Sequence, residues 1–509
     1  MAYDLIVIGG GPAGVSAALR ARELGATVAL VERNFLGGTG MNDGCVPVRV
    51  LAKAARAIRD AQQFATYGLE AVPPTINFPD LLERAQQVVY ELHEKKQLVN
   101  HLANVGVEVY ENVGDAAFVS ADRIQFKNGG GLTGRKFIIC VGGHSRRLNF
   151  PGSEYAITYD EVWSMDKLPE SLIIVGGGAI GCQLASVFDT FGVKVTLLNT
   201  SSRILGMEDA AIAEAITEEF DRLGIEIIVN AKGLRRIEKP GDQLELFYGS
   251  DDNEQSIKAE AVITAVGWPG NFEKLNLAAA GVELNGPYIA VNDRLQTTAP
   301  NIYAAGDITG HVMLVQTASH EARYAVENAL LGESVHHLNT SIPHGSFTDP
   351  EYAGIGLTEA QALKTTECAI AVVPYADMDR AVIDDHKVGF CKLIVDVKTH
   401  LVIGAHVVGE QAVEVIQIVA AAMGAEMPVE KLAHLDFAYP TFAAIIGLAA
   451  RQVAIEMNWI PVESYWNGLS RRRIAEWERT AGGTTTGVYP LITDALGREV
   501  HEVEGVRPL

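Results

Sequence analysis

Cysteine is scarce in this chain, and none of its cysteines stands in a C-x-x-C pair. The 509 residues include five, which are widely scattered: Cys45, Cys140, Cys182, Cys368 and Cys391. This spacing argues against a disulfide framework and against a thiolate metal site, so we expect no bound metal. It also indicates a reducing compartment.

Positive charge and long apolar runs are limited as well. The 41 Lys and Arg are outnumbered by 63 Asp and Glu, and the net charge of -22 would repel nucleic acid. The longest apolar run, 437–450, is too short to span a bilayer. No basic leader precedes the apolar segment at 3–8. We therefore expect a cytoplasmic protein without an integral membrane segment.

A dinucleotide motif opens the chain. Residues 4–8 are predicted as a strand, 9–14 as a glycine turn, 15–24 as a helix and 27–31 as a second strand that ends at Glu32. In such a unit the glycines let the backbone approach a pyrophosphate, the helix N-terminus binds its charge, and the acidic residue reaches the ribose. The predicted contacts are Gly9, Gly11, Pro12, Ala13, Gly14 and Glu32.

A second copy follows, with a strand at 172–175, a glycine turn at 176–181, a helix at 182–191 and a strand at 193–198. Glu32 and Asn199 each stand 18 positions after the last glycine of their turn, so Asn199 is the equivalent of Glu32. The predicted contacts here are Gly176, Gly178, Ile180, Gly181 and Asn199.

Asn199 bears on the choice of nicotinamide nucleotide. A carboxylate there would repel a 2′-phosphate by roughly 4 kcal/mol for unit charges about 4 Å apart at an effective dielectric near 20. Asn199 carries no such charge, and Thr200 and Arg203 add a donor and a cation. The sequence thus predicts that NADP is accepted alongside NAD; the alternative is a neutral turn with a surface arginine.

Between the two motifs, residues 37–49 hold Cys45 and Pro47 just where a helix at 48–64 is predicted to begin. A thiol at a helix N-terminus tends to ionise, although a lone cysteine can also serve only for packing. A long helix is expected at 81–105 and another at about 314–330. The strand before that last helix ends in Gly306 and Asp307.

These features in this order resemble the flavoprotein disulfide reductase family. The resemblance implies an α/β fold with two Rossmann-like dinucleotide-binding domains and an α+β C-terminal dimerisation domain. It places an FAD-binding domain at 1–150 and 280–338, an NAD(P)-binding domain at 151–279, a dimerisation domain at 339–459 and a C-terminal extension at 460–509. It further implies FAD and NAD(P)H as cofactors and a homodimer.

The resemblance also assigns residues. For FAD it implies Glu32, Arg33, Gly38, Thr39, Gly114, Gly142 and Asp307, in addition to the first turn. For NAD(P)H it implies Asn199, Thr200, Arg203 and Gly267, in addition to the second turn.

The departures from the family bear on function. Gly40 stands where disulfide-active members have the substrate-exchanging cysteine, whereas Cys45 matches the cysteine beside the flavin. The family's His-Pro-Thr-x-x-Glu pattern corresponds to Tyr439, Pro440, Thr441 and Ala444. Tyrosine, with a reference pKa near 10, is a poor base at neutral pH. His434 lies nearby in sequence and is an alternative candidate for the role of the missing histidine.

A third departure concerns the family's lysine–glutamate pair, which corresponds to Arg49 and Gln183. Loss of the glutamate would leave Arg49 with less local compensation, and we hypothesise a raised flavin reduction potential. The predicted catalytic residues are therefore Cys45, Arg49, Gln183 and Tyr439.

The resulting prediction is an FAD-dependent NAD(P)H oxidoreductase that passes electrons to a small-molecule, non-disulfide acceptor, most readily a quinone. The closest resemblance is to a quinone-reducing branch that lacks the redox disulfide. Mercuric reductases need paired C-terminal cysteines, and no cysteine follows Cys391. Three alternatives stay open: a pyridine nucleotide transhydrogenase, a disulfide reductase of dihydrolipoyl dehydrogenase or single-cysteine type, and a redox-sensing flavoprotein.

Overall fold

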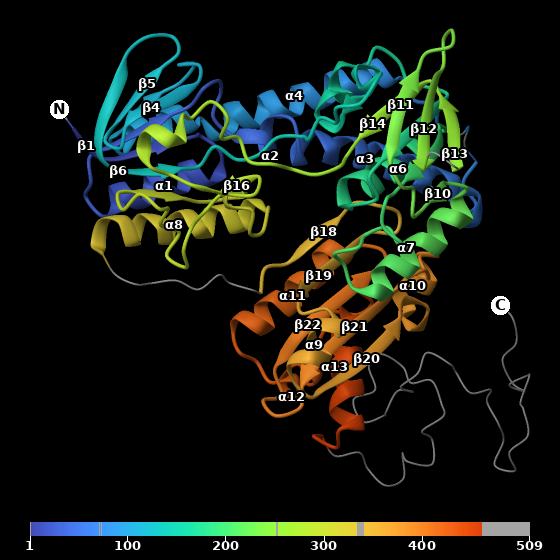
Figure 1. The fold of residues 1–509 in the computed structure, drawn as a ribbon. Helices are drawn as coiled ribbons and strands as arrows, with labels where there is room; N and C mark the ends of the chain where they lie inside the picture. Colours follow the sequence, from blue (N-terminus) through green and yellow to red (C-terminus); the bar gives the residue numbers. More distant parts are fainter. Residues whose placement is uncertain (1, 71, 73, 251–252, 333–340, 461–509) are drawn as a thin grey trace, which may run out of the picture. The chain divides into compact units, whose positions relative to one another are not determined.

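The computed structural model describes residues 2–70, 72, 74–250, 253–332 and 341–460 (Figure 1). All of the predicted C-terminal extension except Ile460 lies outside this part of the chain. The chain divides into two compact units. The nucleotide unit comprises 1–202 and 225–339, and the C-terminal unit comprises 203–224 and 340–509.

The first sheet of the nucleotide unit is built on the first dinucleotide motif. Its order is β3-β2-β1-β6-β5-β4, with β17 paired to β6; the first four strands and β17 run parallel, whereas β4 and β5 are antiparallel. The strands are β1 (Tyr3–Ile8), β2 (Val28–Val31), β3 (Val107–Tyr110), β4 (Ala116–Ser120), β5 (Arg123–Phe126), β6 (Gly131–Ile139) and β17 (Ile302–Ala304).

Two helices pack together against one face of this sheet, α1 (Pro12–Glu23) and α8 (Val315–Leu331) (Figure 1). Their contact is close because small side chains fill it, among them the fully buried Ala17, Ala21 and Ala325. This packing holds the N-terminus of α1, which carries several of the predicted flavin contacts.

The segment between β2 and β3 holds four helices: α2 (Gly38–Asn42), α3 (Cys45–Gln62), α4 (Phe78–Lys96) and α5 (Leu98–Asn104). The predicted single helix at 81–105 is wrong. Gln97 has a left-handed backbone, with φ 41°, and its N–H donates to the carbonyl of His93 at 2.8 Å, which ends α4. The predicted helix at 48–64 begins three residues earlier, at Cys45.

The second sheet repeats the arrangement of the first, in the order β10-β9-β8-β14-β7 with every pair parallel. Its elements are β7 (Ile157–Thr158), β8 (Ser171–Val175), α6 (Ala179–Thr190), β9 (Lys194–Leu198), β10 (Glu226–Ile228) and β14 (Ala261–Thr264). Between β10 and β14 the chain forms a separate antiparallel sheet, made of β11 (Leu234–Glu238), β12 (Leu244–Ser250) and β13 (Asn253–Ala259). A short hairpin, β15 (Leu284–Asn285) and β16 (Tyr288–Ile289), follows.

The C-terminal unit is an antiparallel sheet covered by helices, as an α+β domain requires. The sheet order is β18 (His344–Ser346), β19 (Tyr352–Gly356), β22 (Val402–Val408), β21 (Phe390–Asp396) and β20 (Cys368–Pro374). Helices α11 (Ala412–Gly424) and α13 (Ala444–Glu456) bury their apolar faces against it (Figure 1). The shorter helices are α9 (Glu359–Thr365), α10 (Asp379–Ile383) and α12 (Val429–Ala433).

Helix α7 (Ala210–Leu223) belongs to the C-terminal unit, although its sequence lies between β9 and β10. The predicted boundaries grouped it with the second dinucleotide motif, and those boundaries stay a prediction. Short 3-10 helices complete the described chain: η1 (Phe64–Tyr67), η2 (Ser153–Tyr155), η3 (Tyr159–Ser164), η4 (Leu277–Ala280), η5 (Asp307–Thr309) and η6 (Tyr375–Asp377). Within the described ranges, none of the helices combines the length and the apolar character that a membrane crossing requires.

Candidate functional site

The first glycine turn has no room for a side chain at Gly9 or Gly14. Gly9 has φ 104°, and a Cβ there would clash with the carbonyl of Cys140, the residue directly after the neighbouring strand. A Cβ on Gly14 would clash with the carbonyl of Gly9, because the start of α1 lies directly on the strand end. These contacts hold the turn as tightly as a pyrophosphate-binding loop requires.

The second turn has the same geometry. Gly176 has φ 114°, and a Cβ there would clash with the carbonyl of Ala265, while one on Gly181 would clash with the carbonyl of Gly176. In both turns a glycine with extended backbone, Gly11 or Gly178, precedes the helix and provides no side-chain cap. The two helix N-termini therefore meet the requirement for an anion site.

The residues present fit a bound dinucleotide at the first turn. Gly38 begins α2, and a Cβ on it would come within 2.8 Å of the Gly11 Cα, so two backbone segments approach each other with no side chain between them. Pro12 stands at the first position of α1 and Thr39 at the second of α2.

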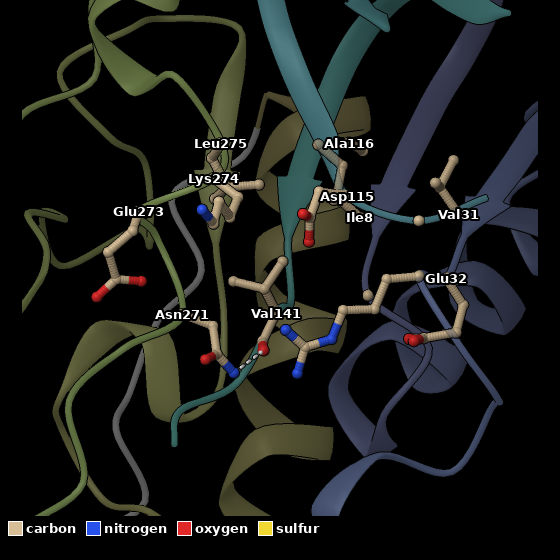
Figure 2. Close-up of a pocket in the computed structure, with 13 residues that line it drawn as sticks. Ile8, Val31, Glu32, Asp115, Ala116, Val141, Asn271, Glu273, Lys274 and Leu275 are labelled. Atoms are coloured by element: carbon tan, nitrogen blue, oxygen red, sulfur yellow. Dashed lines mark hydrogen bonds between the residues drawn. The ribbon is translucent and has the colours of Figure 1, made fainter. Parts of the chain in front are cut away.

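A cavity of about 90 Å³ lies at the carboxyl ends of β1 and β2 (Figure 2). Four residues that were predicted to hold FAD line it together: Gly9, Glu32, Arg33 and Gly114. The other wall is the loop from Asn271 to Leu275, in which the Asn271 amide donates to the Val141 carbonyl at 3.0 Å. Sequence reasoning missed this loop, since no motif marks it.

Glu32 holds the first turn as well as facing this cavity. Its carboxylate accepts from the N–H of Gly10 at 2.7 Å and from the N–H of Asn34 at 2.9 Å. The corresponding bond of the second turn runs from the N–H of Gly177 to the Asn199 side-chain oxygen at 3.2 Å. Glutamate and asparagine thus do the same structural work, and they differ in the charge that they present.

The remaining residues predicted for the nicotinamide nucleotide lie around the second turn and after it. Ile180 is exposed in the first turn of α6, and Thr200 is exposed after β9. Arg203 falls in the C-terminal unit, and its guanidinium donates to the carbonyls of Gly206 at 3.1 Å and Glu208 at 3.0 Å. Their binding roles stay predictions.

All five cysteines lie in the described chain and all are free, and only Cys45 is exposed. Cys45 is the first residue of α3, yet its pKa is raised, because the surrounding protein desolvates the thiol and the Asp307 carboxylate adds to the effect. The raised pKa runs against the expected ionisation of this thiol, and the catalytic role of Cys45 stays a prediction. Desolvation and a nearby negative charge outweigh the helix N-terminus.

Gly40 lies in α2 close to the start of α8. A Cβ added to it would come within 3.2 Å of the Val315 side chain. The cysteine loop and the N-terminus of α8 therefore lie beside each other in the nucleotide unit.

Arg49 and Gln183 lie on two helices that pack together, α3 and α6. Further along the same pair of helices, the Arg59 guanidinium donates to the Thr190 hydroxyl at 3.2 Å. The contact between the helices supports the predicted meeting of Arg49 and Gln183, which itself stays a prediction.

Asp307 follows β17 at the start of η5 and accepts a hydrogen bond from the indole N–H of Trp268 at 2.9 Å. Burial raises the pKa of Asp307, the bond from Trp268 opposes that effect, and the Glu321 carboxylate adds to it. Trp268 directly follows Gly267, a residue predicted to contact the nicotinamide nucleotide. Sequence reasoning missed Trp268 because a tryptophan in a loop carries no signal of its partner.

Gly142 has φ 66°, and its carbonyl accepts from the N–H of Asn271 at 3.0 Å. The segment after β6 and the segment after β14 are thus joined by backbone hydrogen bonds. These bonds hold side by side the two segments that carry Gly142 and Gly267, which are predicted to contact the two different nucleotides.

Tyr439 lies in the C-terminal unit, is exposed, and donates its hydroxyl to the Asp379 carboxylate at 2.7 Å. His434 contacts the carbonyl of Glu430 through Nδ1 at 2.5 Å. The predicted role of Tyr439 at an active site formed with a second chain stays a prediction.

Two dinucleotide turns on parallel sheets, a cysteine loop after the first, and an aspartate ahead of α8 define a flavin-dependent oxidoreductase that uses a nicotinamide nucleotide. The comparisons agree with this class. Residues 3–322 match the family described as Pyridine nucleotide-disulphide oxidoreductase, and residues 342–450 match its dimerisation domain. The chain belongs to this family, whose members bind FAD and use NAD(P)H.

Curated relatives include a dihydrolipoyl dehydrogenase of Bacillus subtilis, 32% identical over 466 residues that cover 88% of this chain and 97% of that protein. A mercuric reductase of Bacillus cereus is 34% identical over 451 residues, 88% of this chain and 71% of that protein. Among solved structures, the HOCl-induced flavoprotein disulfide reductase RclA from Escherichia coli has a TM-score of 0.78 at 28% identity, covering 89% of this chain and all (100%) of that one. LpdA from Mycobacterium tuberculosis has a TM-score of 0.79 at 26% identity, covering 88% and 99%.

Proposed function

We propose that this protein is a homodimeric NAD(P)H oxidoreductase that passes electrons through its flavin to a quinone-like small molecule. The observation that carries the proposal is the state of the cysteine loop. Cys45 is a free thiol, and Gly40 occupies the position of the exchanging cysteine. No disulfide can form within this loop, so the dithiol relay of disulfide-active relatives is absent.

The chemistry of Cys45 supports a non-disulfide acceptor. Disulfide exchange requires a thiolate, and desolvation raises the pKa of Cys45, which works against thiolate formation. A single-cysteine disulfide reductase is therefore disfavoured as well. The thiol would instead provide a polarisable, uncharged contact beside the flavin.

Each remaining part has a stated role in the proposal. FAD would be held by the first glycine turn, Glu32 and Asp307, and would supply the acceptor for hydride from the nicotinamide. Arg49 would stabilise negative charge near the cysteine loop. Tyr439 would face the acceptor across the dimer, but its hydroxyl proton already has an acceptor in Asp379, so hydrogen bonding to the substrate would require exchange of that partner.

The proposal is tested by anaerobic reduction of the purified FAD protein with NADPH or NADH, followed by mixing with menadione or with lipoamide. We expect menadione to reoxidise the flavin and lipoamide to leave it reduced. The Cys45→Ser variant should retain most menadione turnover, and Cys368→Ser, a partly buried cysteine outside the loop, is the matched control.

Other results would identify the rivals. Reoxidation by lipoamide that Cys45→Ser abolishes would establish a single-cysteine disulfide reductase. Reoxidation only by the other nicotinamide nucleotide would establish a transhydrogenase. Negligible turnover with every acceptor, and unchanged nucleotide binding in Cys45→Ser, would favour a redox sensor.

A further inference from the structure

Trp268 joins the two nucleotide-binding parts of the nucleotide unit. It lies in the loop after β14, yet its indole N–H donates to Oδ2 of Asp307, at the start of η5, at 2.9 Å. The indole N–H is a donor only, and a carboxylate is its strongest acceptor. The bond therefore restrains Oδ2 of the Asp307 carboxylate.

The backbone around Trp268 is held on both sides. The N–H of Arg146 donates to the carbonyl of Gly267 at 3.1 Å, and the N–H of His144 donates to the carbonyl of Pro269 at 3.0 Å. The Trp268 carbonyl itself accepts from the Tyr288 hydroxyl at 3.1 Å. The loop is thus pinned to the segment that follows β6.

The indole ring is also held in one place. It packs on Tyr159, with ring centroids 5.8 Å apart. On another side it lies against Gly143, where a Cβ would come within 2.6 Å of the indole Cδ1 and still closer to Nε1. The absence of a side chain at 143 is what gives the ring this position.

We propose that Trp268 is a positioning residue that orients the Asp307 carboxylate to bind FAD, and that it does so from the loop predicted to contact the nicotinamide nucleotide. This inference rests on the proposed role of Asp307 in FAD binding. With Oδ2 held by Trp268, Oδ1 keeps one direction for a flavin hydroxyl. Without the bond, the carboxylate loses that orientation and a hydrogen bond that favours its charged form.

The variant Trp268→Phe keeps an aromatic ring and removes only the N–H and part of the ring volume. In titrations of FAD-depleted protein with FAD, we expect the dissociation constant to rise about tenfold, the effect of losing one charge-assisted hydrogen bond. The pH dependence should shift as well. Binding needs the carboxylate and is lost as pH falls through the Asp307 pKa, so the loss should occur at higher pH in the variant.

The other titratable groups that interact with Asp307 are Glu321, Cys45 and Tyr159, and Trp268→Phe substitutes none of the three. An infrared titration of the Asp307 carboxyl in FAD-free protein reads the same shift without any catalysis. The Asp307 band should protonate at higher pH in Trp268→Phe than in the original chain.

Gly143→Ala perturbs the same contact from the other side, because its φ lies outside the left-handed region and its methyl group would displace both the indole and the backbone carbonyl of Pro269, within 2.8 Å. It should reproduce the effects of Trp268→Phe. The matched control is Trp163→Phe, which removes another indole N–H, donated at 2.8 Å to the backbone carbonyl of Asp43. That acceptor does not titrate, so the pH at which FAD binding is lost should not move.

Asp307→Asn separates this inference from the proposal on which it rests. If Asp307→Asn binds FAD as tightly as the original chain, the assignment of Asp307 to FAD fails. If Asp307→Asn weakens binding while Trp268→Phe and Gly143→Ala leave both the affinity and its pH dependence unchanged, the inference about Trp268 is overturned.

Discussion

The amide at position 199 allows a direct test of nucleotide choice. Glu32 shows that a carboxylate at the equivalent position can hold its turn, with a bond of 2.7 Å to the N–H of Gly10. Asn199→Glu should therefore preserve the turn while adding a negative charge. Because that charge would repel a 2′-phosphate, the KM for NADPH should rise tenfold or more and the KM for NADH should not.

Steady-state kinetics with both nucleotides and menadione would measure the effect. Asn199→Gln, which adds length without charge, is the control and should keep the preference of the original chain. Equal changes for NADH and NADPH in Asn199→Glu would show that position 199 does not face the 2′-phosphate.

Arg49 carries the second residue-scale prediction. If it stabilises negative charge at the reduced flavin, Arg49→Ala should lower the flavin reduction potential by tens of millivolts, since 1.4 kcal/mol corresponds to about 30 mV in a two-electron couple. Anaerobic titration against reference dyes measures the potential. Arg59→Ala, on the same helix, is the control, and an unchanged potential in Arg49→Ala would rule out the hypothesis.

Residues show where sequence reasoning succeeds and where it stops. The glycines at 9, 14, 176 and 181 were predictable because a side chain at any of these four positions would clash with a backbone carbonyl, and the glycine motif in the local sequence reflects that requirement. The pKa of Cys45 and the partner of Asp307 were not, because both depend on atoms that are distant in the chain. A local signal such as a helix N-terminus can be outweighed by neighbours that only the fold supplies.

At the scale of elements, α7 is held by a buried ion pair. Asp209 caps its N-terminus by accepting from the N–H of Ala211 at 3.0 Å, and the same carboxylate accepts from Lys392 on β21 at 2.7 Å. The side chains of Asp209 and Lys392 are 1% and 6% exposed. Burial would raise the pKa of Asp209, but the bonds from Lys392 and from the N–H of Glu359 outweigh it, so the pKa is lowered.

Lys392→Met should destabilise the C-terminal unit by about 3–5 kcal/mol at pH 7, because it leaves the Asp209 charge buried without its cation. Because the pKa of Asp209 is lower in the folded chain than in the unfolded chain, its ionised carboxylate stabilises the fold at pH values above the unfolded pKa, which is near 4. This stabilisation is lost as the pH falls through the folded pKa of Asp209. The difference in the free energy of unfolding between the original chain and Lys392→Met should therefore narrow below about pH 4. Chemical denaturation at several pH values measures it.

The double variant Lys392→Met with Asp209→Asn removes the unpaired charge and should recover much of the loss. Lys387→Met is the control, because it breaks only the exposed pair with Asp385 and should cost little. If Lys392→Met were no less stable than Lys387→Met, the buried pair would not hold α7.

The sequence placed most elements well, and its failures have physical causes. The strands and helices of both dinucleotide motifs follow local periodicity, which is why they were predictable. The break at Gln97 was missed because glutamine gives no signal for a left-handed conformation. The pairing of Asp209 with Lys392, which ties the start of α7 to β21, could not be predicted because the two residues are 183 positions apart.

At the scale of the whole molecule, residues 342–450 match a dimerisation domain, and this part of the chain exposes several large apolar side chains. Val382, Ile383 and Val388 are 53%, 55% and 48% exposed, in or just after α10. Asp379, the first residue of that helix, accepts the Tyr439 hydroxyl. Exposed apolar side chains gathered in sequence beside a predicted active-site residue are typical of an interface between chains.

We therefore expect the protein to sediment with twice the 54.7 kDa mass of one chain, and Ile383→Asp to shift it toward single chains. A charge buried at an interface lacks a partner, which weakens association strongly. Leu363→Asp, which alters an equally exposed leucine on α9, should leave the mass unchanged. If Tyr439 acts across the dimer, menadione turnover should fall with the dimer fraction in Ile383→Asp while FAD stays bound. Full turnover by single chains would show that each chain holds a complete site, and it would remove Tyr439 from the acceptor half-reaction.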